Sequence, residues 1–263
     1  VTPTPNTALI VSAQRVASSL DSFTLVAIPL FILAGGLMNT GGIAMRLIDL
    51  AKVLVGWLPG SLAQISVVAN ALFGAISGSA VASAASVGAT LSPLQRQAGY
   101  NMPICAAANV ASSPCGLLIP PSGALIVYSL ISGGTPVDVL FVAGHLPGIL
   151  MAGSVMLWLA ILARRGELPT PVRRYSMNEA AHIFWRALPA LAMIAIIMGG
   201  IVGGIFTATE AAGVAALYTL VLGLLYRSLT LKSLLGSVIN ASVGTAVVML
   251  MVGVSMTMSW LLA

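Results

Sequence analysis

Apolar residues form long segments along the chain, separated by short polar stretches. A helix needs about 20 apolar residues to cross the ~30 Å hydrocarbon core of a bilayer. Five segments are close to this length: 22–39, 137–163, 187–206, 207–226 and 238–262. Residues 1–22 are more polar and predict a loop. The pattern therefore predicts an all-helical, polytopic membrane protein.

The segment 42–57 has a different pattern, in which apolar and charged residues are mixed. Ile43, Leu47, Leu50 and Leu54 recur at helical spacing and share one face of a helix. Charged residues in the same segment also recur at helical spacing. The segment therefore predicts an amphipathic helix that lies in the membrane interface.

The apolar segment 103–131 is interrupted by Pro120 and Pro121. Each proline lacks an N–H group, and its ring clashes with the preceding helical turn. At ~1.5 Å per residue the interruption falls within the bilayer core. The segment therefore predicts a discontinuous helix, although a simple kink is an alternative reading of the same prolines.

Composition narrows the class of protein. Of the 263 residues 59% are hydrophobic and 6% are charged, and the mean hydropathy is +1.06. A soluble domain needs far more Lys, Arg, Asp and Glu on its surface. These values exclude a soluble enzyme, a nucleic-acid-binding protein and a disordered chain. Cys105 and Cys115 lie in one apolar segment, ten residues apart, which favours free thiols.

The few basic residues set the expected topology, because cytoplasmic loops are enriched in Lys and Arg. Five of the eleven basic residues lie in the polar segment 164–186, which is therefore expected to be cytoplasmic. Counting crossings back from this loop places Arg96 on the same side, and Lys52 is expected there because it is basic. Ten of the eleven basic residues are then cytoplasmic, and only Arg15 is outside. The segment 61–95 must consequently return to the side on which it starts.

Segment 61–95 is short for two crossings of ~20 residues each and a turn. Its centre holds glycine and small polar residues, which predicts a re-entrant helical hairpin with its tip at Ser77, Gly78 and Ser79. Two tightly packed full crossings would give the same topology. Close helix packing alone would also account for the small residues of 77–90.

The hairpin tip and the proline break are expected at a comparable depth. Non-helical backbone is tolerated there only within protein or against a water-filled cavity. Half-helix ends and free carbonyl groups suit a cation and an anionic group. Serine hydroxyls suit sodium, and six are available: Ser77, Ser79, Ser83, Ser112, Ser113 and Ser122.

Thr207 and Glu210 have the spacing of a capping box at the start of a helix. The alternative interpretation is that these polar side chains, together with Thr209, border the ion site. His145 is expected near the outer membrane interface, where it is more typical of an interfacial residue than of a proton relay.

Four motifs in this order resemble the large membrane subunit of tripartite ATP-independent periplasmic transporters. They are QRVASSLDSFTLVAIPLFILAGGLMNTGG at 14–42, ISGSAVASAASVGATLSPLQRQAGY at 76–100, ASSPCGLLIPPSGALIVYS at 111–129 and GGIFTATEAAGVAALY at 203–218. The resemblance implies a multi-pass subunit of the bacterial inner membrane that takes up organic acids with Na⁺ as coupling ion and no other cofactor. It implies two protein partners, a small four-helix membrane subunit and a periplasmic substrate-binding protein. The lipid bilayer is a further expected partner, and nucleic acid is not.

The resemblance also implies an elevator-type fold with two inverted repeats, each with a re-entrant hairpin. A first membrane helix before Val1 and the second hairpin after Ala263 are expected to be missing, so that only the first hairpin is present. The implied substrate-binding residues are Ser77, Gly78, Ser79, Pro120, Pro121 and Ser122. The implied sodium ligands are Ser77, Ser79, Ser83, Ser122, Thr207 and Thr209. Ser83 departs from the family, whose members often have Asp there.

Four regions are expected from this resemblance. Residues 1–60 would hold an outer loop, the first membrane helix and the interfacial helix of a scaffold. Residues 61–136 would form the transport domain, with the hairpin and the discontinuous helix. Residues 137–186 would hold a membrane helix and the basic cytoplasmic loop, and residues 187–263 would begin the second repeat.

The leading hypothesis is sodium-coupled uptake of a small organic acid, such as a dicarboxylate or a sialic acid, rather than enzymatic activity. A sodium-independent anion channel or a passive membrane scaffold is a second class. An intramembrane serine hydrolase is a remote third, because Ser77 or Ser79 would need a base. His145 is the intramembrane candidate, and it is expected away from the tip.

Overall fold

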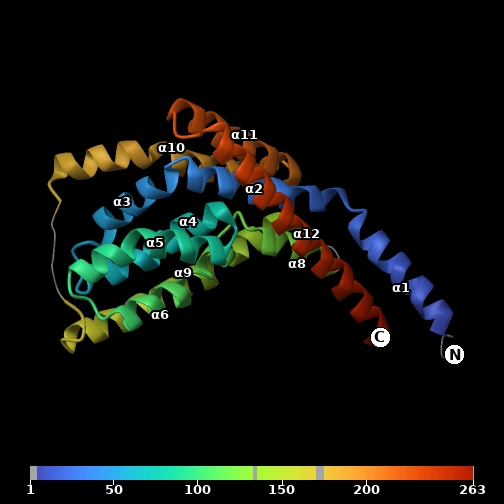
Figure 1. The fold of residues 1–263 in the computed structure, drawn as a ribbon, viewed down its shortest axis with the longest axis horizontal. Helices are drawn as coiled ribbons and strands as arrows, with labels where there is room; N and C mark the ends of the chain where they lie inside the picture. Colours follow the sequence, from blue (N-terminus) through green and yellow to red (C-terminus); the bar gives the residue numbers. More distant parts are fainter. Residues whose placement is uncertain (1–4, 133–134, 170–174, 263) are drawn as a thin grey trace.

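The computed structural model describes residues 5–132, 135–169 and 175–262, in which every regular element is a helix (Figure 1). In chain order the elements are α1 (Pro5–Leu20), the 3₁₀ helix η1 (Phe23–Val26), α2 (Ala27–Thr40), α3 (Ile43–Val55), α4 (Ser61–Ser77), α5 (Ala80–Gln97), α6 (Met102–Ser112), α7 (Cys115–Leu118), α8 (Gly123–Ile131), α9 (Val137–Arg164), α10 (Met177–Val202), α11 (Ala208–Leu225) and α12 (Leu231–Leu262). The expected all-helical class is confirmed.

Among the described residues, four helices are long and apolar enough to cross a membrane, namely α9, α10, α11 and α12. Two bent helix pairs raise the number to six if each pair forms one span. The structure therefore agrees with a polytopic membrane protein. The segments 137–163 and 207–226 are helical as predicted, and α12 begins at Leu231, before the expected start at 238.

The polar segment 164–186 is only partly a loop. α10 begins at Met177, well before the crossing predicted to start at 187. Ser176 and Glu179 form a capping box there, in which the Ser176 N–H donates to Glu179 Oε2 at 3.0 Å. This cap starts the helix within the polar sequence, because it satisfies backbone N–H groups that a helix start leaves free.

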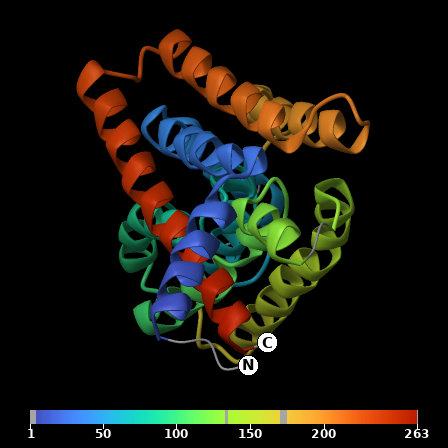
Figure 2. The same cartoon turned by 90° about the vertical axis from the view of Figure 1, so that its right-hand side faces the viewer.

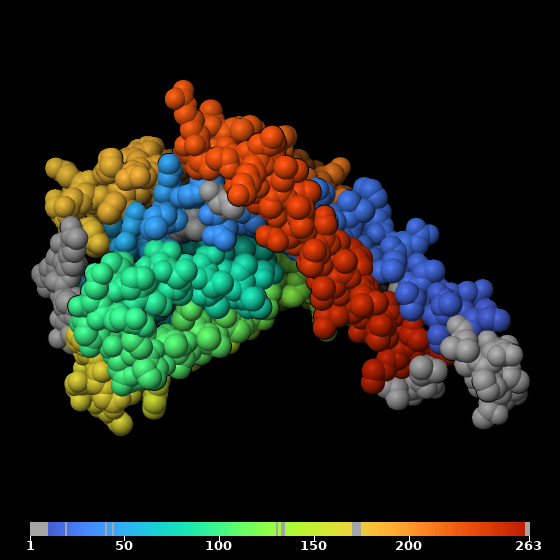
Figure 3. Space-filling view, in the orientation of Figure 1, coloured from blue at the N-terminus to red at the C-terminus, as the bar shows by residue number. Residues whose placement is uncertain are grey.

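The prediction of a loop over 1–22 is wrong for Pro5–Leu20, which form α1. Polar side chains lower the hydropathy of this stretch, but its Ala, Leu, Gln and Arg residues are good helix formers. α12 packs along α1, as the crossing of the blue and red helices in Figure 2 shows. In Figure 3 the side chains of α12 lie at the surface, and several apolar ones, such as Leu250, are exposed.

α4 and α5 form the helical hairpin predicted for 61–95, with its tip at Ser77, Gly78 and Ser79. Gly78 has a left-handed backbone with a φ of +61°, a conformation that favours glycine. Ser79 is the N-cap of α5, and its Oγ accepts a hydrogen bond from the Ala82 N–H at 3.3 Å. The chain can therefore reverse direction in a very short turn.

The predicted discontinuous helix consists of α6 and α7 on one side of the break and α8 on the other. Met102–Leu118 and Gly123–Ser129 are bent by 50° relative to each other. Between them the backbone is not helical, and the Pro120–Pro121 peptide bond is cis. The prolines therefore interrupt the helix, and the simple kink is the wrong reading.

α2 lies between two layers of helices (Figure 1). α10 and α11 lie on one side of it, whereas α4, α5, α6 and α9 lie on the other. Phe31 of α2, Phe73 of α4, Phe141 of α9 and Met193 of α10 are buried in one hydrophobic cluster that joins the layers. The core of the molecule is therefore built around α2.

α3 is amphipathic, as the pattern of 42–57 predicts. Its residues Ile43, Leu47 and Leu50 are buried, and the helix packs against α4 and α10. Leu54 does not share this environment and is half exposed. Protein therefore covers most of the apolar face, and a location of α3 in the membrane interface stays a prediction.

Basic side chains gather at one end of the molecule. Lys52, Arg96 and Arg164 lie in the last turns of α3, α5 and α9. These three helices end at the side of the molecule where α10 begins, on the left in Figure 1. We call this side the basic end. Its location on the cytoplasmic side stays a prediction, and Arg173 and Arg174 lie outside the described residues.

Candidate functional site

The tip of the α4–α5 hairpin lies against the break between α7 and α8. A Cβ placed on Gly78 would lie 3.4 Å from the nitrogen of Gly123 and 3.9 Å from the Cα of Ser122. The structure thus brings together the residues predicted for the substrate site: Ser77, Gly78, Ser79, Pro120, Pro121 and Ser122. We call these six residues the tip-and-break site.

Four helix ends converge on the tip-and-break site. α4 and α7 end there with their C-terminal carbonyl groups, while α5 and α8 begin there with their N-terminal N–H groups, of which the Ala82 N–H is capped by Ser79 Oγ. The helix macrodipole makes an N-terminal end favourable for an anion and a C-terminal end favourable for a cation. The backbone alone can therefore attract both a carboxylate and a cation at this point.

The hydroxyl of Ser122 is the most informative side-chain group in the site. Ser122 is completely buried, and its Oγ has no hydrogen-bond partner, a property that only one other buried side-chain atom shares among the described residues. Leaving a buried polar group unpaired costs about 1–3 kcal/mol. A cation or a polar ligand bound at the break would satisfy this oxygen.

α2 closes the site on a third side. The backbone of Gly35 lies so close to Ser77 that a Cβ on Gly35 would fall 2.7 Å from the Cα of Ser77. The Ser77 Oγ is held within the turn, 3.4 Å from both the nitrogen and the carbonyl oxygen of Ser79. The tip therefore rests directly on the backbone of α2.

Ser83 lies deeper in the hairpin, in a buried polar network centred on Asn70. The Ser83 Oγ donates to Asn70 Oδ1 at 2.8 Å. Asn70 Nδ2 lies 2.8 Å from Ser112 Oγ and 2.9 Å from Asn109 Oδ1. Ser83 and Ser112 therefore have partners inside the protein, and their service as sodium ligands stays a prediction.

Asn70 and Asn109 are the residues that the sequence pattern did not single out. Asn109 Nδ2 also donates to the carbonyl oxygen of Ala84 at 2.8 Å. The two amides thus tie α4, α5 and α6 together just below the tip. The available signal was the presence of two uncharged amides in apolar segments, since polar residues at membrane depth are costly and commonly functional.

The other end of the hairpin is anchored through the backbone of Leu62. Its N–H donates to the Tyr100 hydroxyl at 3.3 Å, and its carbonyl oxygen accepts from Gln95 Nε2 at 3.0 Å. Burial raises the pKa of the Tyr100 phenol above its usual value, so this hydroxyl stays neutral. Both ends of the hairpin are therefore fixed to their neighbours.

Thr207 and Thr209 lie at the start of α11. The Thr207 Oγ1 accepts from the Glu210 N–H at 3.3 Å, and Glu210 Oε2 accepts from the Thr207 N–H at 2.8 Å, which completes a capping box. The Thr209 Oγ1 donates to the carbonyl oxygen of Phe23 at 3.4 Å. The described hydrogen bonds thus link both residues to α11 and η1 and not to the tip-and-break site.

His145 lies nearer to the break than the sequence suggested. Together with Pro120 and Met198 it lines an apolar cavity of about 390 Å³ between α4, α9 and α10. Its Nδ1 lies 2.8 Å from the carbonyl oxygen of Phe141. No described hydrogen bond joins His145 to a serine, so a serine–base pair for hydrolysis is not formed in the described part of the chain.

The atoms of the tip-and-break site that could coordinate a cation are hydroxyl and carbonyl oxygens, which are the ligands that hard cations prefer. Cys105 and Cys115 are free and buried. Across the residues that the structure describes, no group of three His, Cys, Asp or Glu side chains could hold a metal ion.

Discontinuous membrane helices are a common place for solute and ion sites in secondary transporters. The fold and the site define a polytopic membrane protein in which a hairpin tip packs against such a broken helix. Residues 2–263 match a family described as "Tripartite ATP-independent periplasmic transporter, DctM component". The chain belongs to this family, which confirms the resemblance of the four motifs. A family of transporter components also agrees with the expectation that the chain is not an enzyme.

Several curated proteins are similar to the chain. The uncharacterized protein YgiK of Salmonella typhimurium is 52% identical over 256 residues, which are 97% of this chain and 59% of that protein. The 2,3-diketo-L-gulonate TRAP transporter large permease protein YiaN of Escherichia coli is 39% identical, over 96% of this chain and 59% of its own length. The sialic acid TRAP transporter large permease protein SiaM of Vibrio cholerae is 37% identical, over 99% of this chain and 61% of its own length. The chain thus spans about three fifths of these relatives.

Proposed function

We propose that this chain is part of the large membrane subunit of a sodium-coupled secondary transporter that moves a small organic acid into a bacterial cell. The observation that carries the proposal is the buried, unpartnered Ser122 hydroxyl at the meeting point of four helix ends. Family membership supports a transport role, and the relatives named for 2,3-diketo-L-gulonate and sialic acid support an organic acid as substrate.

In the proposed mechanism a sodium ion binds first at the tip-and-break site. Ser122 Oγ and the carbonyl groups at the ends of α4 and α7 would supply oxygen ligands. The bound cation would hold the tip against the break, and the N-terminal ends of α5 and α8 would then receive a substrate carboxylate. The hairpin, α6 and the polar network around Asn70 would move as one unit, as an elevator-type transporter requires.

The proposal includes two protein partners and a location. Substrate would arrive from a periplasmic binding protein, and a small four-helix membrane subunit would complete the membrane complex in the inner membrane. Membership of a tripartite transporter family supports these partners. The binding protein would do most of the selection between acids, because the site in this chain offers backbone groups and hydroxyls rather than a charged side chain.

Sodium binding can be tested without knowledge of the substrate. The full transporter that contains this chain is purified in detergent, and its Tm is measured while Na⁺ replaces K⁺ at constant ionic strength. We expect Na⁺ to raise the Tm, and we expect Ser122→Ala to weaken the apparent sodium affinity about tenfold, because one oxygen ligand is lost. Ser242→Ala, a change on the exposed surface of α12, is the matched control and should bind sodium as the wild type does.

Transport itself is tested in vesicles that contain the full transporter and its partners. Uptake of sialic acid and of 2,3-diketo-L-gulonate, each supplied by the binding protein, should depend on an inward sodium gradient. Uptake at the same rate without sodium would contradict the coupling and would favour an anion channel. An equal Tm in Na⁺ and in K⁺ would contradict a specific sodium site at the tip and the break.

A further inference from the structure

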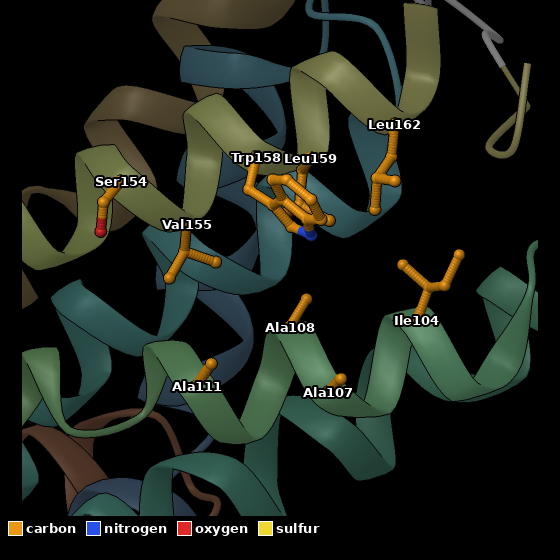
Figure 4. Close-up of a pocket in the computed structure, with 9 residues that line it drawn as sticks. All are labelled: Ile104, Ala107, Ala108, Ala111, Ser154, Val155, Trp158, Leu159 and Leu162. Atoms are coloured by element: carbon orange, nitrogen blue, oxygen red, sulfur yellow. The ribbon is translucent and has the colours of Figure 1, made fainter. Parts of the chain in front are cut away.

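An apolar groove lies between α6 and α9, away from the tip-and-break site. Its volume is about 360 Å³, and nine residues line it: Ile104, Ala107, Ala108, Ala111, Ser154, Val155, Trp158, Leu159 and Leu162. Figure 4 shows the two helices side by side, with Trp158 and Leu159 projecting from α9 toward the alanines of α6. Three of the four residues from α6 are alanines, whose side chains are too short to fill the space.

The groove offers hydrocarbon surface and is accessible from outside. Ala107, Ala111 and Trp158 are exposed, with Trp158 at 57%. Ser154 is the polar residue of the lining, and its hydroxyl donates to the carbonyl oxygen of Met151 in its own helix at 2.8 Å. A guest in the groove therefore meets mainly methyl and methylene groups and the indole ring of Trp158.

The groove runs along the helices toward the basic end. From Ser154 to Leu162 it follows α9 for ~12 Å at 1.5 Å per residue. Arg164 and Arg165 come two and three residues after Leu162, and both are exposed. Glu167 is the acidic residue close by in the sequence, so the two arginines leave this rim positive.

We propose that this groove binds an anionic phospholipid, with one acyl chain along α6 and α9 and the phosphate at Arg164 and Arg165. Basic positions next to apolar surface between membrane helices, on the cytoplasmic side, are suited to anionic lipid head groups. Trp158 lies about 9 Å before Arg164 along the helix, and tryptophan is typical of the level at which acyl chains meet head groups. The site is independent of the proposed sodium site.

The first experiment uses the unaltered protein. The full transporter that contains this chain is incubated with phosphatidylglycerol that carries a photoactivatable group on one acyl chain, irradiated and digested, and the labelled peptides are identified. We expect labelling of the peptides that contain 104–111 and 154–162, and we expect unlabelled phosphatidylglycerol to compete more strongly than phosphatidylcholine. Labelling spread evenly over α9, α10 and α12 would contradict a defined site.

Variants then separate the acyl chain from the head group. Ala107→Leu with Ala111→Leu fills the groove, and we expect it to reduce phosphatidylglycerol retained in native mass spectrometry about tenfold. Val110→Leu is the matched control, since Val110 lies on the same helix, is exposed and does not line the groove. Arg164→Gln with Arg165→Gln should abolish the preference for phosphatidylglycerol over phosphatidylcholine while an acyl chain is still bound.

Three results would overturn the proposal. The groove-filling variant could retain phosphatidylglycerol like the wild type, or the arginine variant could keep the same lipid preference. The groove-filling variant could also lose the small membrane subunit while lipid labelling stays unchanged, which would show that protein covers the groove. A Tm close to that of the wild type shows that each variant is folded, and this control does not depend on sodium binding or on the proposed transport function.

Discussion

Gly74 of α4 and Gly116 of α7 lie in backbone contact where the hairpin crosses the broken helix. A Cβ on either residue would overlap the Cα of the other. The contact lies one turn below Ser77, so it sets how closely α7 approaches the tip. The tip and the break can meet only because both positions are glycine.

We expect Gly116→Ala to destabilise the protein by at least ~2 kcal/mol, because backbone atoms on both sides cannot move aside. The better helix propensity of alanine returns at most about 1 kcal/mol. The Tm of the purified transporter in detergent measures the effect. Gly153→Ala and Gly213→Ala are the controls, since a Cβ at either position meets nothing within 4 Å. An unchanged Tm for Gly116→Ala would show that α7 does not hold this position against α4.

Asn70 is the centre of the buried polar network, so we expect its replacement to lower the stability of the protein more than replacement of an exposed asparagine. Asn70→Ala removes the amide that the Ser83, Asn109 and Ser112 side chains share. The two serine hydroxyls keep the carbonyl oxygens of Asn70 and Asn109 as partners, whereas Asn109 Oδ1 loses its partner, and an unpaired polar group away from water costs about 1–3 kcal/mol. We therefore expect a clear decrease in Tm. Asn240→Ala, at an exposed position of α12, should have little effect. Equal behaviour of the two variants would contradict a structural role for Asn70.

The hairpin and the break could be predicted from the sequence because each rests on local chemistry. Pro120 and Pro121 cannot continue a helix, and Gly78 can take the left-handed turn that reverses the chain. The basic residues on both flanks of segment 61–95 added the expectation that this segment ends on the side of the membrane on which it starts. These three signals need no knowledge of which helices pack together.

Features that depend on packing between distant residues could not be predicted. Asn70 and Asn109 are 39 positions apart, and nothing local indicates that their amides meet. α1 packs along α12, more than 200 residues later in the chain, and nothing in the polar sequence of α1 indicates this contact. Thr209 resembled a site residue by its motif, but the fold directs its hydroxyl to the carbonyl oxygen of Phe23.

Thr207 and Glu210 provide a test that separates helix capping from ion binding. Because their side chains satisfy each other's backbone N–H groups, we expect Thr207→Ala to cost about 1 kcal/mol of stability and Glu210→Ala to lower the Tm as well. We expect the sodium-induced rise in Tm to be unchanged in both. Thr207→Ser keeps the hydroxyl and should retain the wild-type Tm. A lower sodium affinity in Thr207→Ala alone would assign Thr207 to the ion site after all.

The contact between α2 and the tip predicts a variant that lowers transport more than a neighbouring change does. A Cβ on Gly35 would lie 2.7 Å from the Cα of Ser77 and 2.9 Å from its carbonyl oxygen. Gly35→Ala must therefore push the tip away from α2 or from the break, because the added methyl group meets backbone atoms and not a flexible side chain. A displaced tip separates the helix ends that converge on Ser122, so we expect the sodium affinity to decrease about tenfold if a single ion ligand is lost.

Gly36→Ala is the matched control for this change. A Cβ on Gly36 would meet Ser237 of α12 at 3.6 Å, which is an ordinary van der Waals distance. Both variants gain the same methyl group in the same helix, so they share the effect on helix propensity. Sodium-dependent shifts in Tm and sodium-driven uptake are measured for both. If Gly35→Ala matches Gly36→Ala in both measurements, the tip does not need the surface of α2, and the closed arrangement at Ser77 is not what positions Ser122 for the ion.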